Sequence, residues 1–469
     1  AMKATFALAM LFLAASTFAQ KEVSMPKDLP PYGPEKPLSP PVVHSTKLDN
    51  GLTVWLVSEP GFPKIAFTVA IRGGFAADPA DRPGISDLLS KTVDQGTKSR
   101  SAKQIAQELQ AAGGDLSASP HKDFIDLSTA VLASKMDAGI SVLSDILENA
   151  AFPDAEVALA KRNLSDSLQQ SESEPSFLAS RAMAKVLFGD HPYHVISASQ
   201  ESVAASTSAD LRRIFAQRFR PDQAVLVAVG DFDNAKMLDA LKLKFAAWKS
   251  PADPPISLPA PPSSTPEHAV FVVPRPGSVQ TTLELGAFGP RRSDPDYAAT
   301  TVANAIYGGT FSSRLVSNIR EDKGYTYSPF AFLGTYQAAG VVVTRADVRN
   351  EVTSPSLNEI NYELNRIATT APTDEELSKA KRYLVGTEAI QLQSRTSVSS
   401  ELAGLWVDDL PPEQIGIYGQ KVANTSSAEV QAAAKKYFPA YRSAIVAVGE
   451  EKVVREAMAP FGLPIKTLP

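Results

Sequence analysis

The chain contains no cysteine among its 469 residues. This absence excludes disulfide bonds, thiol catalysis, iron–sulfur clusters and cysteine-ligated zinc. Neither sign of charge prevails, because 46 lysines and arginines stand against 51 aspartates and glutamates, for a net charge of -5. Such a balance gives no reason to expect a nucleic acid or an anionic membrane surface as partner.

Histidine is also scarce. Only five are present, namely His44, His121, His191, His194 and His268. His191 and His194 stand closest together, but Pro192 breaks helical spacing and no paired acid follows, so we expect a structural role. The chain has no G-x-S-x-G elbow for a serine hydrolase. Gly308-Gly309 lacks the lysine of a phosphate-binding loop.

Long apolar runs are missing except at the start of the chain. There, Lys3 precedes an apolar run, and small residues follow up to Ala19. This pattern is typical of a secretory signal peptide, which we place at residues 1–19. The run from Ala4 to Ala15 is short for a membrane span. We therefore expect an exported mature protein without a membrane span, periplasmic in a double-membrane bacterium.

Two proline-rich stretches divide the rest of the chain. Residues 20–41 and residues 251–267 each contain seven prolines. We interpret the first as an extended arm and the second as a stiff linker. The linker separates residues 42–250 from residues 268–469, and a chain of this length is expected to form more than one domain.

The two parts repeat each other. Residues 208–231 align without gaps on residues 427–450, and residues 155–164 align on residues 375–384. Both matches imply a period of about 220 residues, far longer than a solenoid repeat. The sequence therefore predicts two duplicated domains.

Local patterns predict a mixture of strands and helices in the first part. The expected strands are 52–57 and 65–71, taken as a pair, followed by 125–130 and 224–229. The expected helices are 85–93, opened by Pro83-Gly84, then 102–112, 136–149, 155–170 with Asp154 as its cap, and 211–219. This order predicts an α+β fold in which helices cover a mostly antiparallel sheet.

Three stretches carry a resemblance to a known family. They are GGTFSSRLVSNIREDKGYTYS at 308–328, KTVDQGTKSRSAKQIAQELQAAGGDLSAS at 91–119, and FGDHPYH at 188–194. Their order and spacing resemble the processing-peptidase branch of the pitrilysin/insulinase family of inverted zinc metallopeptidases, over nearly all of residues 42–460. The resemblance implies two homologous α+β domains that form half of a clamshell.

Active members of that family carry H-x-x-E-H on a helix, and a further glutamate downstream completes the zinc site. The corresponding positions here are Asp87, Ser90, Lys91 and, for the distant glutamate, Ser167. An ammonium at a ligand position repels a dication. We therefore expect no zinc in this chain, and we expect Asp87 and Lys91 to form an i,i+4 surface ion pair.

In two-subunit members, the subunit without the motif supplies an arginine and a tyrosine to its partner's active site. The resemblance assigns these roles to Arg320 and to Tyr327, with Tyr325 as the alternative tyrosine. In a strand, both tyrosines would share one face. The competing interpretation of Arg320 is a salt bridge with Glu321. Arg314 is expected to be structural, and Ser312 and Ser313 are expected to cap its helix.

The resemblance thus implies a non-catalytic, substrate-binding subunit of a heterodimeric zinc metallopeptidase that acts on peptides. Zinc would belong to a homologous partner subunit with H-x-x-E-H. Residues 115–119 correspond to a family strand that holds substrate by strand addition. The alternatives are a metal-free structural or peptide-binding protein of the same fold, and an enzyme with an unrecognised site.

Overall fold

The computed structural model describes residues 39–257, 259–263 and 265–468. The expected signal peptide and most of the expected arm lie outside these residues. Within them, no helix combines the length and the apolar character needed to cross a bilayer. Residues 42–250 are called the first half below, and residues 268–468 the second half.

The first half contains a six-stranded sheet in the order β1-β2-β6-β3-β5-β4. Its strands are β1 (His44–Lys47), β2 (Thr53–Ser58), β3 (Lys64–Arg72), β4 (Leu116–Pro120), β5 (Phe124–Leu132) and β6 (Ala224–Gly230). Only the β2–β6 pair is parallel. Every residue of β6 is buried, as its sequence AVLVAVG predicts for a central strand covered on both faces.

The second half repeats this arrangement in the order β12-β7-β11-β8-β10-β9. Its strands are β7 (Val270–Pro274), β8 (Gln280–Gly289), β9 (Phe330–Thr335), β10 (Gly340–Arg349), β11 (Ala444–Gly449) and β12 (Ile465–Thr467). The β11–β7 and β12–β7 pairs are parallel and the remaining pairs are antiparallel. Two mostly antiparallel sheets covered by helices confirm the predicted α+β duplication.

The helices also follow the duplication. The first half has α1 (Ile85–Thr92), α2 (Ala102–Ala111), α3 (Met136–Asn149), α4 (Asp154–Ser173), α5 (Pro175–Phe188), α6 (Gln200–Ala205), α7 (Ser208–Arg218) and α8 (Asn234–Lys244). The second half has α9 (Tyr297–Asn304), α10 (Arg314–Val316), α11 (Thr353–Thr369), α12 (Asp374–Gln391), α13 (Arg395–Val407), α14 (Gln414–Asn424), α15 (Ser427–Tyr437) and α16 (Glu451–Met458).

Repeated sequence gives repeated local structure in the aligned helices α7 and α15. Each begins with a reciprocal capping box, formed by Thr207 with Asp210 in α7 and by Ser426 with Glu429 in α15. In both, the hydroxyl accepts from a backbone N–H of the first turn while the carboxylate accepts from the capping residue's own N–H.

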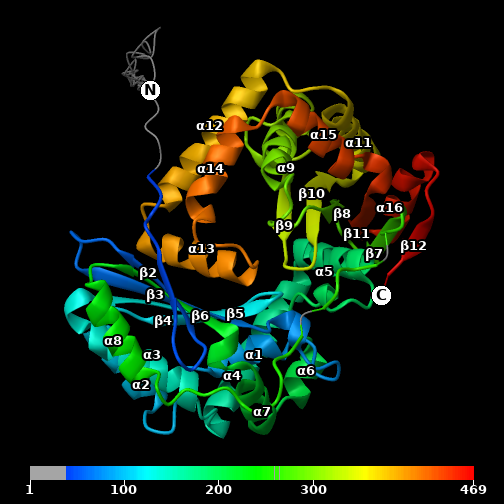
Figure 1. Ribbon diagram of the computed structural model, residues 1–469. Helices are drawn as coiled ribbons and strands as arrows, with labels where there is room; N and C mark the ends of the chain where they lie inside the picture. Colours follow the sequence, from blue (N-terminus) through cyan, green and yellow to red (C-terminus); the bar gives the residue numbers. More distant parts are fainter. Residues whose placement is uncertain (1–38, 258, 264, 469) are drawn as a thin grey trace, which may run out of the picture. The chain divides into compact units, whose positions relative to one another are not determined.

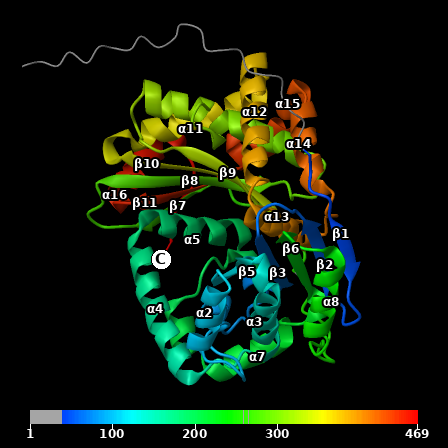
Figure 2. The ribbon, with the colours of Figure 1, turned by 90° about the vertical axis from the view of Figure 1, so that its left-hand side faces the viewer.

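One face of each sheet is covered by a helix from the opposite half (Figures 1 and 2). Helix α5 packs through residues such as Met183 and Leu187 on the second sheet. Helix α13 packs through Val398 and Leu402 on the first sheet. The two halves are therefore joined by buried apolar surface as well as by the linker.

Two local predictions for the first half were wrong. The strands predicted as a pair, β2 and β3, both exist, but β6 lies between them and pairs with each. Asp154 is the first residue of α4 instead of its cap; Pro153 occupies the cap position, and its side chain makes no capping bond. Proline is common at the start of a helix because it needs no N–H partner there.

Candidate functional site

Helix α1 carries the positions that correspond to the zinc motif. It begins after Gly84, whose φ of 77° favours glycine. A Cβ at Gly84 would lie 2.2 Å from the Cα of Ala198, so the start of α1 fits closely against that segment. The Oδ2 of Asp87 accepts a 2.7 Å hydrogen bond from the Ala198 amide.

This contact replaces the predicted ion pair. In the described part of the chain, no ion pair within 4.0 Å joins Asp87 to Lys91, and the amide of Ala198 is the carboxylate's partner. The prediction of a surface pair was wrong because Asp87 is half-buried and lies against another segment. Burial raises the pKa of Asp87 to about 6.

The other zinc-motif positions offer no ligand set. Ser90 is buried and its Oγ has no hydrogen-bond partner among the described residues, while Lys91 is exposed. Ser167 lies exposed on α4 and donates to the carbonyl of Asn163 at 2.8 Å. These residues do not fit a zinc ion, which needs three or four nitrogen, sulfur or carboxylate ligands converging on one point.

The histidines of the described residues do not form a set of zinc ligands either. His121 bonds Asp126 at 2.7 Å and stacks on Phe124. The Nδ1 of His194 donates to the carbonyl of His191, and the Nδ1 of His268 donates to the carbonyl of Ser443. Throughout the described ranges, no cluster of three or more histidines and acids is placed to hold a metal ion.

The FGDHPYH stretch joins the two halves through Tyr193. The fully buried Tyr193 hydroxyl donates to Asp123 at 2.5 Å and accepts from the amide of Ala338 at 3.0 Å. The second carboxylate oxygen of Asp123 accepts from the amide of Gln337. The tip of the β9–β10 hairpin is thereby bonded to the first half, a role that sequence reasoning missed.

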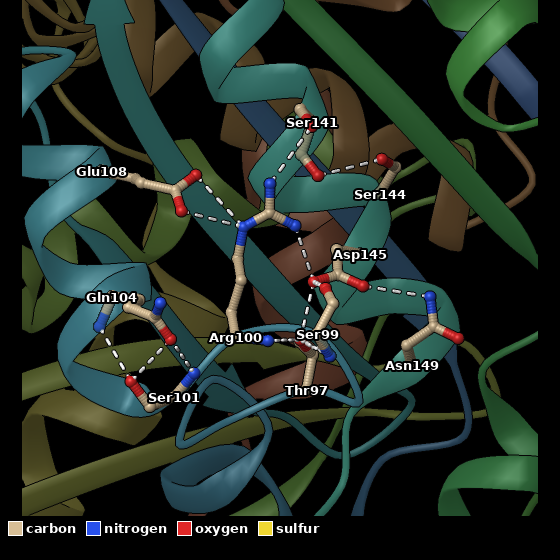
Figure 3. Close-up of polar contacts among 10 residues, drawn as sticks. All are labelled: Thr97, Ser99, Arg100, Ser101, Gln104, Glu108, Ser141, Ser144, Asp145 and Asn149. Carbon is tan, nitrogen blue, oxygen red and sulfur yellow. Dashed lines mark hydrogen bonds and ion pairs between the residues drawn. The ribbon is translucent and has the colours of Figure 1, made fainter.

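Residues 91–119 also build structure (Figure 3). Arg100 donates to Asp145 on α3 at 2.7 Å and to both oxygens of Glu108 on α2 at 3.1 Å. Burial raises the pKa of Asp145, but hydrogen bonds from Thr97, Arg100 and Ser99 outweigh it and hold that pKa below its usual value. The loop before α2 is therefore fixed by a charge-assisted network.

In the second half, Arg320 is surrounded by two aromatic rings and a carboxylate. This residue lies in a π-helical turn, η6 (Ser317–Asp322), that follows α10 directly. Its guanidinium carbon lies 4.3 Å from the ring centre of Phe311 and 4.8 Å from that of Tyr327. Its Nε lies 3.2 Å from a carboxylate oxygen of Glu321, so the predicted salt bridge coexists with the aromatic contacts.

The two aromatic residues are unusually exposed for their size. Tyr327 is 80% exposed and Phe311 is 68% exposed, whereas the Arg320 side chain is only 25% exposed. Phe330 and Phe332 on the edge strand β9 are a second pair of exposed rings, stacked on each other with ring centres 6.0 Å apart. Clustered exposed apolar rings mark interaction surfaces more often than isolated ones.

The structure also distinguishes the two candidate tyrosines. Residues 323–329 form a turn and irregular backbone instead of a strand, so Tyr325 and Tyr327 do not share a strand face. The amide of Tyr325 bonds the carbonyl of Ile319, and its side chain is half-buried. Tyr327 is the ring that contacts Arg320.

Arg314 and Ser313 support this turn. The buried Arg314 bonds both carboxylate oxygens of Glu376 on α12, at 2.6 and 2.8 Å. These bonds, ahead of a smaller opposing effect of burial, lower the pKa of Glu376 to about 2. Ser313 caps α10, whereas Ser312 is exposed.

Comparison with known protein families identifies the family to which this architecture belongs. The family model described as insulinase (peptidase family M16) matches residues 53–195, and the model described as the peptidase M16 inactive domain matches residues 206–384. The chain belongs to the M16 insulinase family of peptidases. Its inactive-type domain fits a non-catalytic subunit of that family.

M16 relatives match most of the chain at low identity. An uncharacterized zinc protease of Streptomyces coelicolor is 24% identical over 372 residues, which cover 77% of this chain and 79% of the relative. The uncharacterized zinc protease YmxG of Bacillus subtilis is 24% identical over 353 residues, which cover 75% of this chain and 85% of YmxG.

Solved structures share the M16 fold. The crystal structure of a peptidase M16 inactive domain from Pseudomonas fluorescens has a TM-score of 0.82 at 25% identity and covers 87% of this chain and 98% of that one. A protease from Helicobacter pylori has a TM-score of 0.83 at 20% identity and covers 88% of this chain and 100% of that one.

Proposed function

We propose that this protein is the non-catalytic, substrate-binding subunit of a heterodimeric M16 metallopeptidase that acts on peptides. The observation that carries the proposal is the contrast between the halves. The first half lacks a ligand set for zinc on α1, whereas the second half presents Arg320 between two exposed aromatic rings. Zinc would be held by a homologous partner subunit with H-x-x-E-H.

Arg320 and Tyr327 have the chemistry for a supporting role in the partner's site. A guanidinium is a rigid fork of hydrogen-bond donors that suits peptide carbonyls. An exposed phenol can donate to an oxygen that gains negative charge in the transition state. Both groups lie within one short segment, so a partner that closes over it receives them together.

The first experiment is purification of the protein from its native host, with mass spectrometry of the proteins that accompany it. We expect a stoichiometric M16 homologue that retains H-x-x-E-H, and peptidase activity of the complex that a chelator abolishes. Recovery without such a homologue would instead support a metal-free structural or peptide-binding role.

The second experiment tests Arg320 in that complex. We expect Arg320→Ala to lower kcat/KM at least ten-fold and Arg320→Lys to restore only part of it, because lysine lacks the planar fork. Arg442→Ala is the matched control, since Arg442 also lies against an exposed tyrosine ring, Tyr441. An unchanged kcat/KM in Arg320→Ala would remove this role.

We also propose that the protein works outside the cytoplasm, on the basis of the signal-peptide pattern in residues 1–19. Fractionation of the native host tests this directly. We expect the protein in the periplasmic fraction with a mature start after about residue 19, read by N-terminal sequencing. An intact N-terminus in the cytoplasmic fraction would contradict export.

A further inference from the structure

The second half contains a cleft that is separate from the Arg320 segment. Its volume is about 600 Å³, within the range of small-ligand sites. It lies among α12, α13, α14 and the residues around the start of α9. Arg320, Phe311 and Tyr327 do not line it.

Helix α12, which forms one wall of the cleft, buries few of its side chains completely. Ala380 is the one buried residue of this helix, whereas the corresponding helix of the first half, α4, buries four side chains. At the cleft, α12 presents the mostly polar or aromatic side chains of Tyr383, Thr387, Glu388 and Gln391, together with the aliphatic Leu384. A concave space with a few polar groups in its lining is typical of a small-molecule site.

The charges in the cleft do not balance. Arg292 is largely buried and forms an ion pair with Glu401. Glu388 then remains as a second carboxylate without a cation of its own, and its Oε2 is enclosed with no hydrogen-bond partner among the described residues. An uncompensated carboxylate in a partly dehydrated site is costly, and a cationic ligand would remove that cost.

Three tyrosines also line the cleft. Tyr297 and Tyr418 lie with their ring centres 5.9 Å apart, and Tyr383 on α12 is 52% exposed. The faces of tyrosine rings attract ammonium and guanidinium groups. Aromatic rings beside an unpaired carboxylate form a suitable environment for an organic cation.

We propose that the cleft lined by Tyr297, Tyr383, Tyr418 and Glu388 binds an ammonium or guanidinium group. Glu388 is the ionic partner, and the tyrosines enclose the alkyl part and the charge of the ligand. The group could belong to a free amine or to a lysine or arginine side chain of a peptide. Both share one recognition chemistry, so the experiment separates them.

The test is isothermal titration of the full chain with two probes at pH 8. Cadaverine represents a free amine, and an end-blocked Ala-Ala-Lys-Ala-Ala peptide represents a side chain. We expect at least one probe to bind, with an affinity at least ten-fold weaker in Glu388→Gln. Glu375→Gln on the same helix is the matched control, because Glu375 lies outside this cleft.

A second variant, Tyr383→Ala, and a series of titrations at different pH values test the same site independently. Tyr383 is half exposed, so Tyr383→Ala should fold normally and still weaken binding several-fold. The groups that face Glu388 are Glu401, Arg292 and the backbone of Gly419, and burial followed by Glu401 raises its pKa to about 7. Binding should therefore weaken as the pH falls below 7, because the carboxylate becomes neutral.

The two probes distinguish a free amine from a peptide side chain as the source of the bound cationic group. Binding of cadaverine indicates a free amine, and binding of the peptide alone indicates a side chain. Failure of both probes to bind, or equal binding by wild type and Glu388→Gln, would overturn the proposal. Neither result depends on a peptidase partner, so it is independent of the proposed function.

Discussion

The hydroxyl of Tyr193 and the carboxylate of Asp123 form a fully buried 2.5 Å hydrogen bond at the junction of the two halves. The same hydroxyl accepts from the amide of Ala338 in the second half. Burial, followed by the charge of Asp123, raises the pKa of Tyr193, so the phenol stays a donor at all ordinary pH values.

Tyr193→Phe should destabilise the protein by about 1–3 kcal/mol, because it leaves a buried carboxylate oxygen and a buried amide with one partner fewer. Chemical denaturation measures the free energy of unfolding. Tyr441→Phe is the control, since Tyr441 is 62% exposed. Equal losses in both variants would mean that the Tyr193 hydroxyl contributes nothing specific.

Asp87 should make stability depend on pH. Burial raises its pKa from 3.8 to about 6 in the folded protein, so the folded state binds the proton more tightly than the unfolded state. The carboxylate therefore lowers stability progressively as the pH rises from about 4 to 6, by at most about 3 kcal/mol.

Asp87→Asn removes this titration. The variant should match or fall below the wild type in stability near pH 4 and gain relative to it above pH 6, measured by urea denaturation at each pH. A constant difference between the two proteins across this range would contradict the raised pKa of Asp87.

Phe311 should position Arg320, since it covers one face of the guanidinium at 4.3 Å. In the complex with its partner, we expect Phe311→Ala to lower kcat/KM about two- to five-fold, as expected for loss of an exposed cation–π contact of about 0.5–1 kcal/mol. Phe311→Tyr should restore activity. Tyr441→Ala, which strips the similar ring beside Arg442, should leave activity unchanged.

Replacement by alanine should have opposite effects on the stability of the protein at two glycines. Gly386 lies inside α12 and a Cβ there meets nothing within 4 Å, so Gly386→Ala should stabilise by about 0.5–1 kcal/mol through helix propensity. A Cβ at Gly340 would lie 1.9 Å from the carbonyl oxygen of Pro290, so Gly340→Ala should lower the melting temperature. Thermal unfolding of both variants measures the contrast.

The sequence predicts the ranges of single helices and strands better than it predicts which strands pair with each other. Helix α3 spans 136–149, the range that its apolar spacing and the stop before Pro153 predict, because both are local signals. The position of β6 between β2 and β3 was missed, because that strand comes from more than 150 residues later in the chain. Local periodicity carries no information about such a partner.

The candidate site shows the same limit. Motif spacing located Asp87, Lys91 and Arg320 in the chain, but it gave the wrong partner for Asp87, whose bond to Ala198 spans 111 residues. The contact of Phe311 with Arg320 was also missed. Phe311 lies inside the quoted GGTFSSRL stretch, and nothing in that pattern distinguishes an exposed ring from a buried one.

The crossing of α5 and α13 between the halves has a consequence for how the chain can be divided. Cutting at residues 251–267 would follow the repeat, yet each fragment would keep a helix that covers the other fragment's sheet and would leave its own sheet bare on that side. The two halves thus form one compact unit, and we expect neither fragment to be stable without the other.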